Sequence, residues 1–547
     1  MSDTADLVLR NGTIATANPA LPRAEALAVR GETIAAVGSE AEIAPLAGPS
    51  TKVIDLEGGL AVPGFIEGHG HFLGLGQALT QLDLRPARCW DDAVAIVADA
   101  ARSARPGQWL LGRGWHQDKW DEAPSPCVEG LPLHDALSAA APRNPVLLRH
   151  ACGHSLLANA LAMEAAEVTP RTPDPPGGRI LRDASGCPTG AFLEAAMDIV
   201  AKAHRRLLDA RTPREKEAER RRLVDLTTRT CLANGITTFH DAGASFESIA
   251  LYRKLAVNGE LGLRLWVMMG EGDEAIRQRL PAARCVGHGA GRLTVRAIKR
   301  FADGAFGSRT AWMLEPYTGR GDDAGIPCSG LHDLADTALL AIENDLQLCV
   351  HAIGDRANRE VLDIFAAAFQ AHPHKTDLRW RIEHAQHLHP DDVPRFARLD
   401  VVAAMQGSHC TCDGPALPAA LGEHRATQRA YVWQSLLKAG AVVINGTDAP
   451  VEDVSPITSF HASVSRRMAD GSVFAPEQRM TRWQALCSYT LAAAYAGFEE
   501  QAKGSLEPGK LADIAVLSRD ILTVPEEEIP ATEVLLTILG GRIAFSR

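Results

Sequence analysis

Eight short runs rich in β-branched and aromatic residues recur along this chain, with helical stretches such as 357–370 and 427–438 between them. Strands that alternate with helices form parallel βαβ units, and eight such units close a (β/α)8 barrel. The sequence therefore predicts an α/β fold of the TIM-barrel type, with its reactive groups at the carboxyl ends of the strands. The predicted strands are residues 61–71, 235–241, 263–269, 293–303, 346–351, 379–384, 401–406 and 441–448.

The first of these runs ends in two histidines that are two residues apart, His69 and His71. Side chains alternate between the faces of a strand, so both imidazoles point the same way and can bind one metal ion. On a helix the same spacing would place them roughly 200° apart. A lone pair of histidines is more often an ordinary surface or core feature. The later runs strengthen the metal hypothesis because they contain or end in further ligand types, Lys299, His351, His384 and Asp448.

These segments resemble the amidohydrolase superfamily, and within it the metal-dependent hydrolases of the N-substituted formamide deformylase type. The resemblance runs through nearly the whole chain in the expected order. It is carried by residues 63–71, Lys299 with 303–311, 351–358, 381–386, 446–450 and, outside the barrel, 504–516.

The resemblance implies two zinc ions. His69 and His71 would bind the first together with Asp448, while His351 and His384 would bind the second. A metal-bound water loses its proton near neutral pH and becomes a nucleophile. Asp448 would then accept that proton and deliver it to the leaving amine. We therefore expect Asp448 to be both a ligand and the catalytic proton carrier.

Lys299 would bridge the two ions only as a carbamate formed with carbon dioxide. An ammonium group has no lone pair and repels a cation, whereas a carbamate presents anionic oxygens. The alternatives are a lysine paired with a nearby carboxylate such as Asp303, or one that extends its ammonium group to solvent. The resemblance favours the carbamate.

About 160 residues separate the first two strands, far more than a βα connection needs. We assign residues 77–225 to an insertion, which the resemblance implies covers the barrel mouth and shapes the substrate pocket. Trp115 and His154 within it are predicted substrate contacts, and packing inside the insertion is the alternative for both. The predicted contacts outside the insertion are Arg309 and His409.

Three other residues have the side chains for a metal or mouth site. His240 ends the second strand, where a hydrogen-bonded barrel histidine is at least as good an interpretation. Cys410 and Cys412 form a Cys-x-Cys motif next to His409. A thiolate metal site is disfavoured there because no second cysteine pair lies nearby at ligand spacing.

Both ends of the chain read as short strands separated by Gly-containing turns. Residues 1–62 and 497–547 are therefore predicted to pair into one small β-sandwich, which flanks a barrel domain at 63–496. The resemblance implies the same arrangement.

Composition limits the partners and the compartment. The net charge of −11 argues against binding to nucleic acid or to an anionic membrane surface. No uncharged apolar run is long enough to cross a bilayer, and no secretory signal is visible. Eleven scattered cysteines fit reduced thiols in the cytoplasm. We expect a cytoplasmic enzyme with a small-molecule substrate, and exposed barrel helices leave a homodimer possible.

The leading interpretation is a zinc hydrolase that cleaves an amide-type C–N bond in a formamide or another N-acyl amine. The alternative among enzymes is a deaminase that acts on ring amidines. Such an enzyme would use one metal and a Glu or His beside the sixth-strand histidine as proton carrier, and it would not need Lys299. The alternative of another class is a barrel that has lost its chemistry and serves as a scaffold. Loss of activity normally erases the metal ligands, and all six are present here.

Overall fold

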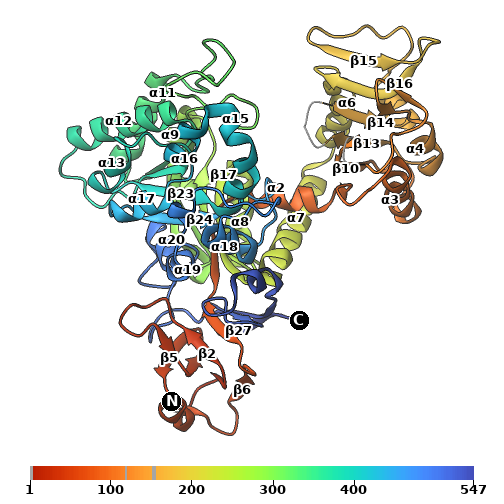
Figure 1. The fold of residues 1–547 in the computed structure, drawn as a ribbon. Coiled ribbons are helices and arrows are strands. Elements are labelled where there is room, and N and C mark those ends of the chain that lie inside the picture. The colour runs from red at the N-terminus through yellow and green to blue at the C-terminus, as the bar shows by residue number, and fades with distance from the viewer. Residues whose placement is uncertain (1–3, 118–119, 151–154) are drawn as a thin grey trace. The chain divides into compact units, whose positions relative to one another are not determined.

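The computed structural model describes residues 4–117, 120–150 and 155–547. Its contacts divide the chain into two compact units (Figure 1). One unit combines Met1–Leu75 with Val224–Arg547 and contains the barrel and the terminal strands. The other unit, Gly76–Leu223, is the insertion that the sequence places at 77–225.

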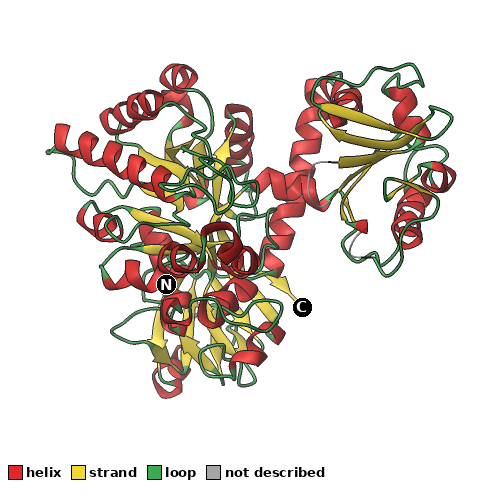
Figure 2. Cartoon of the chain, turned by 45° about the horizontal axis from the view of Figure 1, so that its top comes forward, coloured by secondary structure: helices red, strands yellow, loops and turns green. Residues whose placement is uncertain are grey.

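All eight predicted barrel strands are present, and they form one parallel sheet that is nearly closed. Helices surround these strands (Figure 2). The strands are buried along most of their length, as the continuous apolar run Leu265–Met269 indicates for a strand covered on both faces. The sheet order is β8 (Phe65–Gly70), β17 (Ile236–Ala244), β18 (Arg264–Met269), β20 (Leu293–Phe301), β21 (Gln347–Ala352), β22 (Arg381–His384), β23 (Val402–Gln406) and β24 (Val443–Gly446).

The first predicted strand, residues 61–71, is in fact two strands in two different sheets. β7 (Leu60–Pro63) pairs with a C-terminal strand, and β8 pairs with β17. The change occurs at Gly64, whose N–H donates to the Asp513 carbonyl, whereas the next N–H, of Phe65, donates to the Gly235 carbonyl. The apolar pattern continues from Leu60 to Ile66 across the break, and the available sign of it was the Pro63-Gly64 dipeptide.

The barrel closes where β24 meets β8, and glycines allow the two backbones to approach. A Cβ on Gly68 would lie 2.4 Å from the Asn445 carbonyl oxygen, and one on Gly446 would lie 2.6 Å from the His69 nitrogen. The close approach continues past the strand ends, where the Asp448 N–H donates to the His69 carbonyl at 2.8 Å. The first and last strands are thereby held together at the predicted metal ligands.

Helices cover the outside of the barrel, and each buries its apolar side against the strands. In α12, for example, Val361, Leu362 and Phe365 are buried. The N-terminus of α8 is capped by Ser245, whose side chain accepts from the Ser248 N–H. The principal helices are α8 (Phe246–Val257), α9 (Asp273–Ala283), α11 (Leu331–Glu343), α12 (Asp355–Ala371), α13 (Val393–Arg398), α14 (Gly407–Asp413), α15 (Leu417–Leu421), α16 (Glu423–Arg429), α17 (Trp433–Lys438), α18 (Pro456–Ser465), α19 (Arg482–Ser488) and α20 (Leu491–Ala496).

The two ends of the chain build the predicted additional sheets beside the barrel, with the red N-terminal and blue C-terminal strands together in Figure 1. Residues from both ends share one apolar core, for example Leu9, Ile14, Ile514 and Ile538. One sheet has the order β5 (Thr33–Gly38), β4 (Ala26–Arg30), β1 (Leu7–Arg10) and β6 (Lys52–Asp55). The other has the order β27 (Arg542–Ser546), β26 (Val534–Leu539), β25 (Ile514–Leu517), β7, β2 (Thr13–Ala15) and β3 (Arg23–Ala24).

A buried ion pair joins the barrel to the terminal sheets. Arg264 on β18 donates to both oxygens of Asp513, at 2.7 and 3.0 Å, and both side chains are almost fully buried. Burial alone would raise the pKa of Asp513, but the charge and hydrogen bonds of Arg264 outweigh it and lower that pKa.

We expect Asp513→Asn to lower the free energy of unfolding by about 3–5 kcal/mol at neutral pH, because it leaves the Arg264 charge buried and unpaired. The pKa of Asp513 is lower in the folded than in the unfolded protein. The pair therefore contributes fully above the unfolded value of about 3.9, and its contribution is lost as the pH falls through the folded value. Urea unfolding at pH 7 and pH 3 should show a difference between variant and parent that shrinks in acid. An equal difference at both pH values would contradict this assignment.

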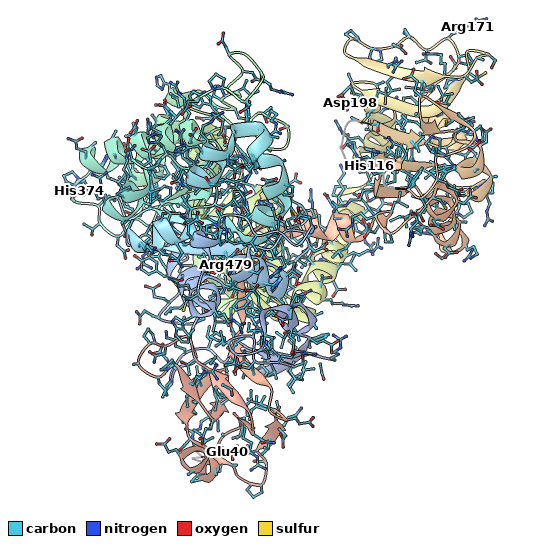
Figure 3. The ribbon with its side chains drawn as sticks, viewed as in Figure 1. Glu40, His116, Arg171, Asp198, His374 and Arg479 are labelled. Carbon is cyan, nitrogen blue, oxygen red and sulfur yellow. The ribbon has the colours of Figure 1, made fainter. Side chains whose placement is uncertain are left out.

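The insertion is a sheet flanked by helices. Its helices include α3 (Trp90–Ser103), α4 (Asp135–Ala140), α5 (Ala160–Ala165) and α6 (Met197–Asp209). The sheet order is β15 (Gly178–Arg182), β16 (Pro188–Glu194), β14 (Ser155–Ala158), β13 (Val146–His150), β10 (Leu110–Trp115) and β9 (Leu82–Asp83). In Figure 3, His116 and Asp198 mark the end of β10 and the start of α6. Helices α2 (Phe72–Leu79) and α7 (Pro213–Ala233) include the boundaries between the units.

Within the described residues, none of the helices is both long enough and apolar enough to span a bilayer.

Candidate metal centre

The first group of metal-ligand types lies where β8 meets β24. The His69 Nε2 and the His71 Nε2 lie 3.5 and 3.3 Å from the same oxygen, Oδ1 of Asp448. His69 is buried, whereas the side chain of His71 is 39% exposed. The ligating atoms of these three residues all lie within 4.8 Å of one another. The spacing of His69 and His71 on a strand therefore places both imidazoles beside one carboxylate.

A second group shares Asp448 and adds His384 and His409, again with ligating atoms within 4.8 Å. His351 packs against this group, since its ring centroid lies 4.5 Å from that of His384. The rings of His69 and His384 are 4.8 Å apart, which joins the two groups into one cluster. The structure thus brings all four predicted histidine ligands together with Asp448.

Hydrogen bonds orient two of these imidazoles. The His384 Nδ1 donates to the Gln406 Oε1 at 2.7 Å, and the His351 Nε2 donates to the Gly304 carbonyl at 3.1 Å. Each bond assigns the proton to one ring nitrogen, so the other nitrogen keeps a lone pair for a cation. His384 therefore offers its Nε2 and His351 its Nδ1.

Lys299 lies in the same cluster, with its Nζ 3.5 Å from the His69 Nε2. Its side chain is buried, and burial lowers the pKa of the amine. In the part of the chain that the structure describes, no carboxylate lies within ion-pair distance of Lys299. The alternative of a pair with Asp303 is not what the structure shows, because the nearest contact of the amine is an imidazole.

Asp303 instead fixes the loop that follows β20. Its carboxylate accepts the backbone N–H groups of Trp312, Ile353 and Gly354 at 2.8–2.9 Å. These bonds tie the loop to the end of β21, next to His351. This role and that of Gln406 were not predicted from the sequence. The sign of both was the position of the polar side chain: Gln406 ends a barrel strand, and Asp303 follows one.

The cluster fits a divalent metal ion by the chemistry of its donors. Oδ1 of Asp448 and Nε2 of His409 are buried and have no hydrogen-bond partner among the described residues. Burial alone would raise the pKa of Asp448, but the neighbouring His71 and His69 outweigh it and hold that pKa below its usual range. Burial lowers the pKa of His69 to about 4, so its imidazole is neutral at pH 7. Neutral imidazoles with an ionised carboxylate are the donor set that zinc prefers.

Two of the predicted ligands have an unusual backbone. Asp448 and His384 have φ values of +54° and +75°, in the left-handed region that side chains other than glycine rarely adopt. Such conformations cost free energy and concentrate at functional sites. The strand ends of β22 and β24 thus bend sharply where the ligands lie.

The predicted substrate contacts have different surroundings. Arg309, with φ +58°, lies in the loop after β20 and places its guanidinium over the rings of Phe306 and Tyr317, at 4.5 and 5.6 Å. One buried terminal nitrogen of this guanidinium, Nη1, has no partner among the described residues. His409 on α14 stacks near His384 at the metal cluster. The contact of either residue with a substrate stays a prediction.

Trp115 lies in the core of the insertion. It is fully buried, its Nε1 donates to the Leu148 carbonyl at 3.1 Å, and it packs against Trp120 and His150. This is the packing that the sequence analysis gave as the alternative, and a substrate contact stays a prediction.

We expect Trp115→Ala to destabilise the insertion by about 3–5 kcal/mol, because it removes a large buried side chain. Hydrogen exchange should show the loss as faster exchange in β10 and β13. If specificity changes while exchange stays as in the parent protein, Trp115 contacts substrate instead.

Four further residues were considered from the sequence, His154, His240, Cys410 and Cys412. His154 lies outside the described residues. His240 is buried and its Nδ1 accepts from Arg381 at 3.0 Å, as expected for a hydrogen-bonded barrel histidine. Neither Cys410 nor Cys412 belongs to a metal-ligand group in the described residues.

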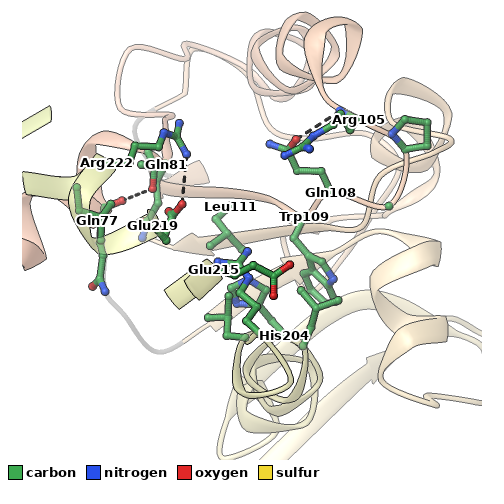
Figure 4. A pocket seen from close by; sticks show the side chains of 17 residues that line it. Gln77, Gln81, Arg105, Gln108, Trp109, Leu111, His204, Glu215, Glu219 and Arg222 are labelled. Carbon is green, nitrogen blue, oxygen red and sulfur yellow. Dashed lines mark hydrogen bonds and ion pairs between the residues drawn. The ribbon is translucent and has the colours of Figure 1, made fainter. Parts of the chain in front are cut away.

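A cavity of about 950 Å³ lies in the insertion and contains none of the predicted metal ligands (Figure 4). Trp109 and His204 form part of its wall, with ring centroids 5.1 Å apart. Arginines and glutamates lie beside one another around it, including Arg222 and Glu219 at 3.8 Å. Because these charges are mixed, the lining favours no single class of ligand.

Comparison with known proteins assigns the chain to one family. Residues 52–545 match the amidohydrolase family. The chain is 34% identical to Protein LONG AFTER FAR-RED 3 of Arabidopsis thaliana, over 98% of this chain and 91% of that protein. It is 28% identical to the N-substituted formamide deformylase of Arthrobacter pascens, over 100% and 99% of the two chains.

A solved structure is similar over the same length. It is an uncharacterized metal-dependent hydrolase from Pyrococcus horikoshii, with a TM-score of 0.75, 25% identity and coverage of 95% of this chain and 99% of that one. The family match spans the barrel, the predicted ligands at its strand ends and the C-terminal strands, and it begins after β5. This chain therefore belongs to the amidohydrolase family of metal-dependent hydrolases.

Proposed function

We propose that this hydrolase cleaves an amide-type C–N bond in a small molecule, with formamides and other N-acyl amines as the substrate class. The observation that carries the proposal is the convergence of four imidazoles, a buried carboxylate and a buried amine that has no carboxylate partner among the described residues. The full-length similarity to a formamide deformylase supports the choice of bond.

We assign two zinc ions to the cluster. His69, His71 and Asp448 would hold one, and His351 and His384 the other, with Lys299 between them as a carbamate. When bound, the ions supply the positive charge that acidifies a water molecule and polarises the substrate carbonyl. Formation of the carbamate needs an uncharged amine, and the burial of Lys299 favours that form.

Asp448 performs the proton transfers. Its Oδ1 faces the cluster without a hydrogen-bond partner among the described residues, so it is free to accept the proton of the attacking water. The same oxygen then donates this proton to the leaving nitrogen as the C–N bond breaks. The products are a carboxylic acid, formic acid for a formamide, and an amine. Arg309 and His409 are the proposed substrate contacts at the mouth.

The deaminase alternative requires a free Glu or His beside the sixth-strand histidine. Glu383 is not free, since it is fully buried and bound to Arg381 at 2.8 and 3.0 Å, but His409 lies beside His384 and its Nε2 has no partner among the described residues. What favours the hydrolase is Lys299, which the deaminase does not need and which lies buried in the cluster, 3.5 Å from the His69 Nε2.

A substrate panel on the zinc-reconstituted enzyme tests the proposal. The panel should contain N-formyl amines, N-acyl amines, carbamates, lactones and ring amidines. We expect hydrolysis of N-formyl or N-acyl amines with equal amounts of acid and amine released. Ammonia release from ring amidines alone would establish the deaminase instead. A protein that binds no metal and turns over nothing would support the scaffold.

A further inference from the structure

Two charged side chains lie inside the barrel next to the metal cluster. Arg381 and Glu383 are both on β22, two residues apart and therefore on the same face, and both are fully buried. The Arg381 guanidinium donates to both oxygens of Glu383, from Nε at 2.8 Å and from Nη2 at 3.0 Å. This two-bonded geometry is the strongest form of an arginine–carboxylate contact.

Glu383 also contacts the metal cluster directly. Its Oε2 is hydrogen-bonded to the Nδ1 of His69. An ionised carboxylate only accepts, so the proton of this bond belongs to Nδ1 and the lone pair of the ring lies on Nε2. That Nε2 is the atom 3.5 Å from both the Asp448 Oδ1 and the Lys299 Nζ.

Arg381 holds the same histidine from the backbone side. Its Nη2 donates to the carbonyl of Gly68, the residue before His69, at 2.7 Å. Its Nη1 donates to the His240 Nδ1 at 3.0 Å, which fixes the guanidinium from a third direction. One arginine therefore secures both the carboxylate behind the imidazole and the peptide that precedes it.

We infer that Arg381 and Glu383 are positioning residues that fix the tautomer, orientation and basicity of His69 for metal binding. The inference rests on the metal centre of the proposed function. Neither residue is needed to fill the barrel, since an apolar pair of similar volume would avoid the cost of burying two charges. A carboxylate behind a metal-binding histidine makes the imidazole a stronger donor, and its loss typically weakens metal binding 10- to 100-fold.

The test is the affinity for zinc, measured by competition with a chelator on folded protein. Glu383→Gln keeps the shape but removes the charge, and its amide can also present a donor to Nδ1. We expect the zinc dissociation constant to rise about 10- to 100-fold. Cobalt-substituted protein should show a changed visible spectrum, because the ligand geometry at His69 is altered. An affinity within threefold of the parent protein, with an unchanged cobalt spectrum, would overturn the inference.

Asp513→Asn is the matched control. Asp513 is also a buried carboxylate bound by two bonds to one arginine, Arg264, and among the described residues its side chain has no hydrogen bond or ion pair with the metal cluster. Both variants should lower the melting temperature of the metal-free protein, and only Glu383→Gln should lose zinc affinity. An equal loss in Asp513→Asn would assign the effect to general destabilisation and contradict the positioning role.

Arg381→Lys provides a second variant if Glu383→Gln does not fold. A lysine keeps the buried positive charge but cannot reach both Glu383 oxygens, Gly68 and His240 at once. We expect a smaller loss of zinc affinity, in the same direction. Unchanged affinity would argue against the inference. Failure of the parent protein to bind zinc would refute the proposed function itself, so the two outcomes are distinguishable.

Discussion

Replacing Lys299 by alanine is expected to remove most of the bound zinc and to abolish turnover. The amine lies within the histidine cluster, 3.5 Å from the His69 Nε2, and it is buried. As a carbamate it would supply anionic oxygens to both ions, and no other carboxylate among the described residues occupies that position. Its removal leaves neutral imidazoles and Asp448 to hold two dications. Metal analysis after dialysis against a weak chelator measures the loss.

Lys503→Ala is the control for this substitution. Lys503 is also buried, but it forms an ion pair with Glu499 and, within the described part of the chain, has no hydrogen bond or ion pair with the cluster. The control should keep its zinc. If Lys299→Ala retains full metal content and activity, the bridging role of Lys299 is refuted.

The proposed carbamate would add a dependence on carbon dioxide. It forms when the uncharged amine attacks carbon dioxide and releases one proton, so zinc reconstitution of the metal-free protein should be faster in bicarbonate than in degassed buffer. Lys299→Ala should show no such dependence. An equal rate for the parent protein in both buffers would leave Lys299 as an amine and contradict the proposal.

Asp448→Asn is expected to lower kcat about 100- to 10,000-fold, the range attributed to general acid–base catalysis. An asparagine oxygen can still contact a metal ion, but it cannot carry a proton between water and leaving amine. Zinc content should therefore stay close to that of the parent protein, which separates this variant from Lys299→Ala. Steady-state kinetics on the substrate found in the panel, with metal analysis of the same sample, gives both numbers.

The zinc content decides how this result is interpreted. A kcat equal to that of the parent protein would remove Asp448 from the mechanism. Loss of zinc together with activity would make Asp448 essential as a ligand and leave its role in proton transfer without support. Asp513→Asn, which removes a buried carboxylate paired with Arg264, should keep kcat.

The barrel could be predicted because its strands are covered on both faces. A run such as Leu265–Met269 is then apolar without interruption, and a glycine marks its end. The same ends face the mouth, so His384 and Asp448 could be assigned to one site from their positions alone. The break at Gly64 was not predicted, because the chain stays apolar as it passes from one sheet to another and only the Pro63-Gly64 dipeptide marks the change.

The contacts around the ligands could not be predicted from the sequence, for a different reason. Glu383 and His69 are 314 residues apart, and only the closed barrel brings them together. Arg381 and Glu383, two residues apart on β22, could have indicated a buried ion pair. Nothing in the sequence indicated that Glu383 also contacts His69. The role of Trp115 could not be predicted from the sequence either, because a tryptophan beside glycines is equally compatible with a substrate pocket and with a packed core.

Diffraction from zinc-loaded crystals, with an anomalous map at the zinc edge, tests the central claim most directly. The account predicts two peaks, one among His69, His71 and Asp448 and one beside His351 and His384. It also predicts carbamate density that continues from Lys299 Nζ to both peaks. Zinc bound away from these side chains, or a free amine at Lys299 beside two bound ions, would contradict it.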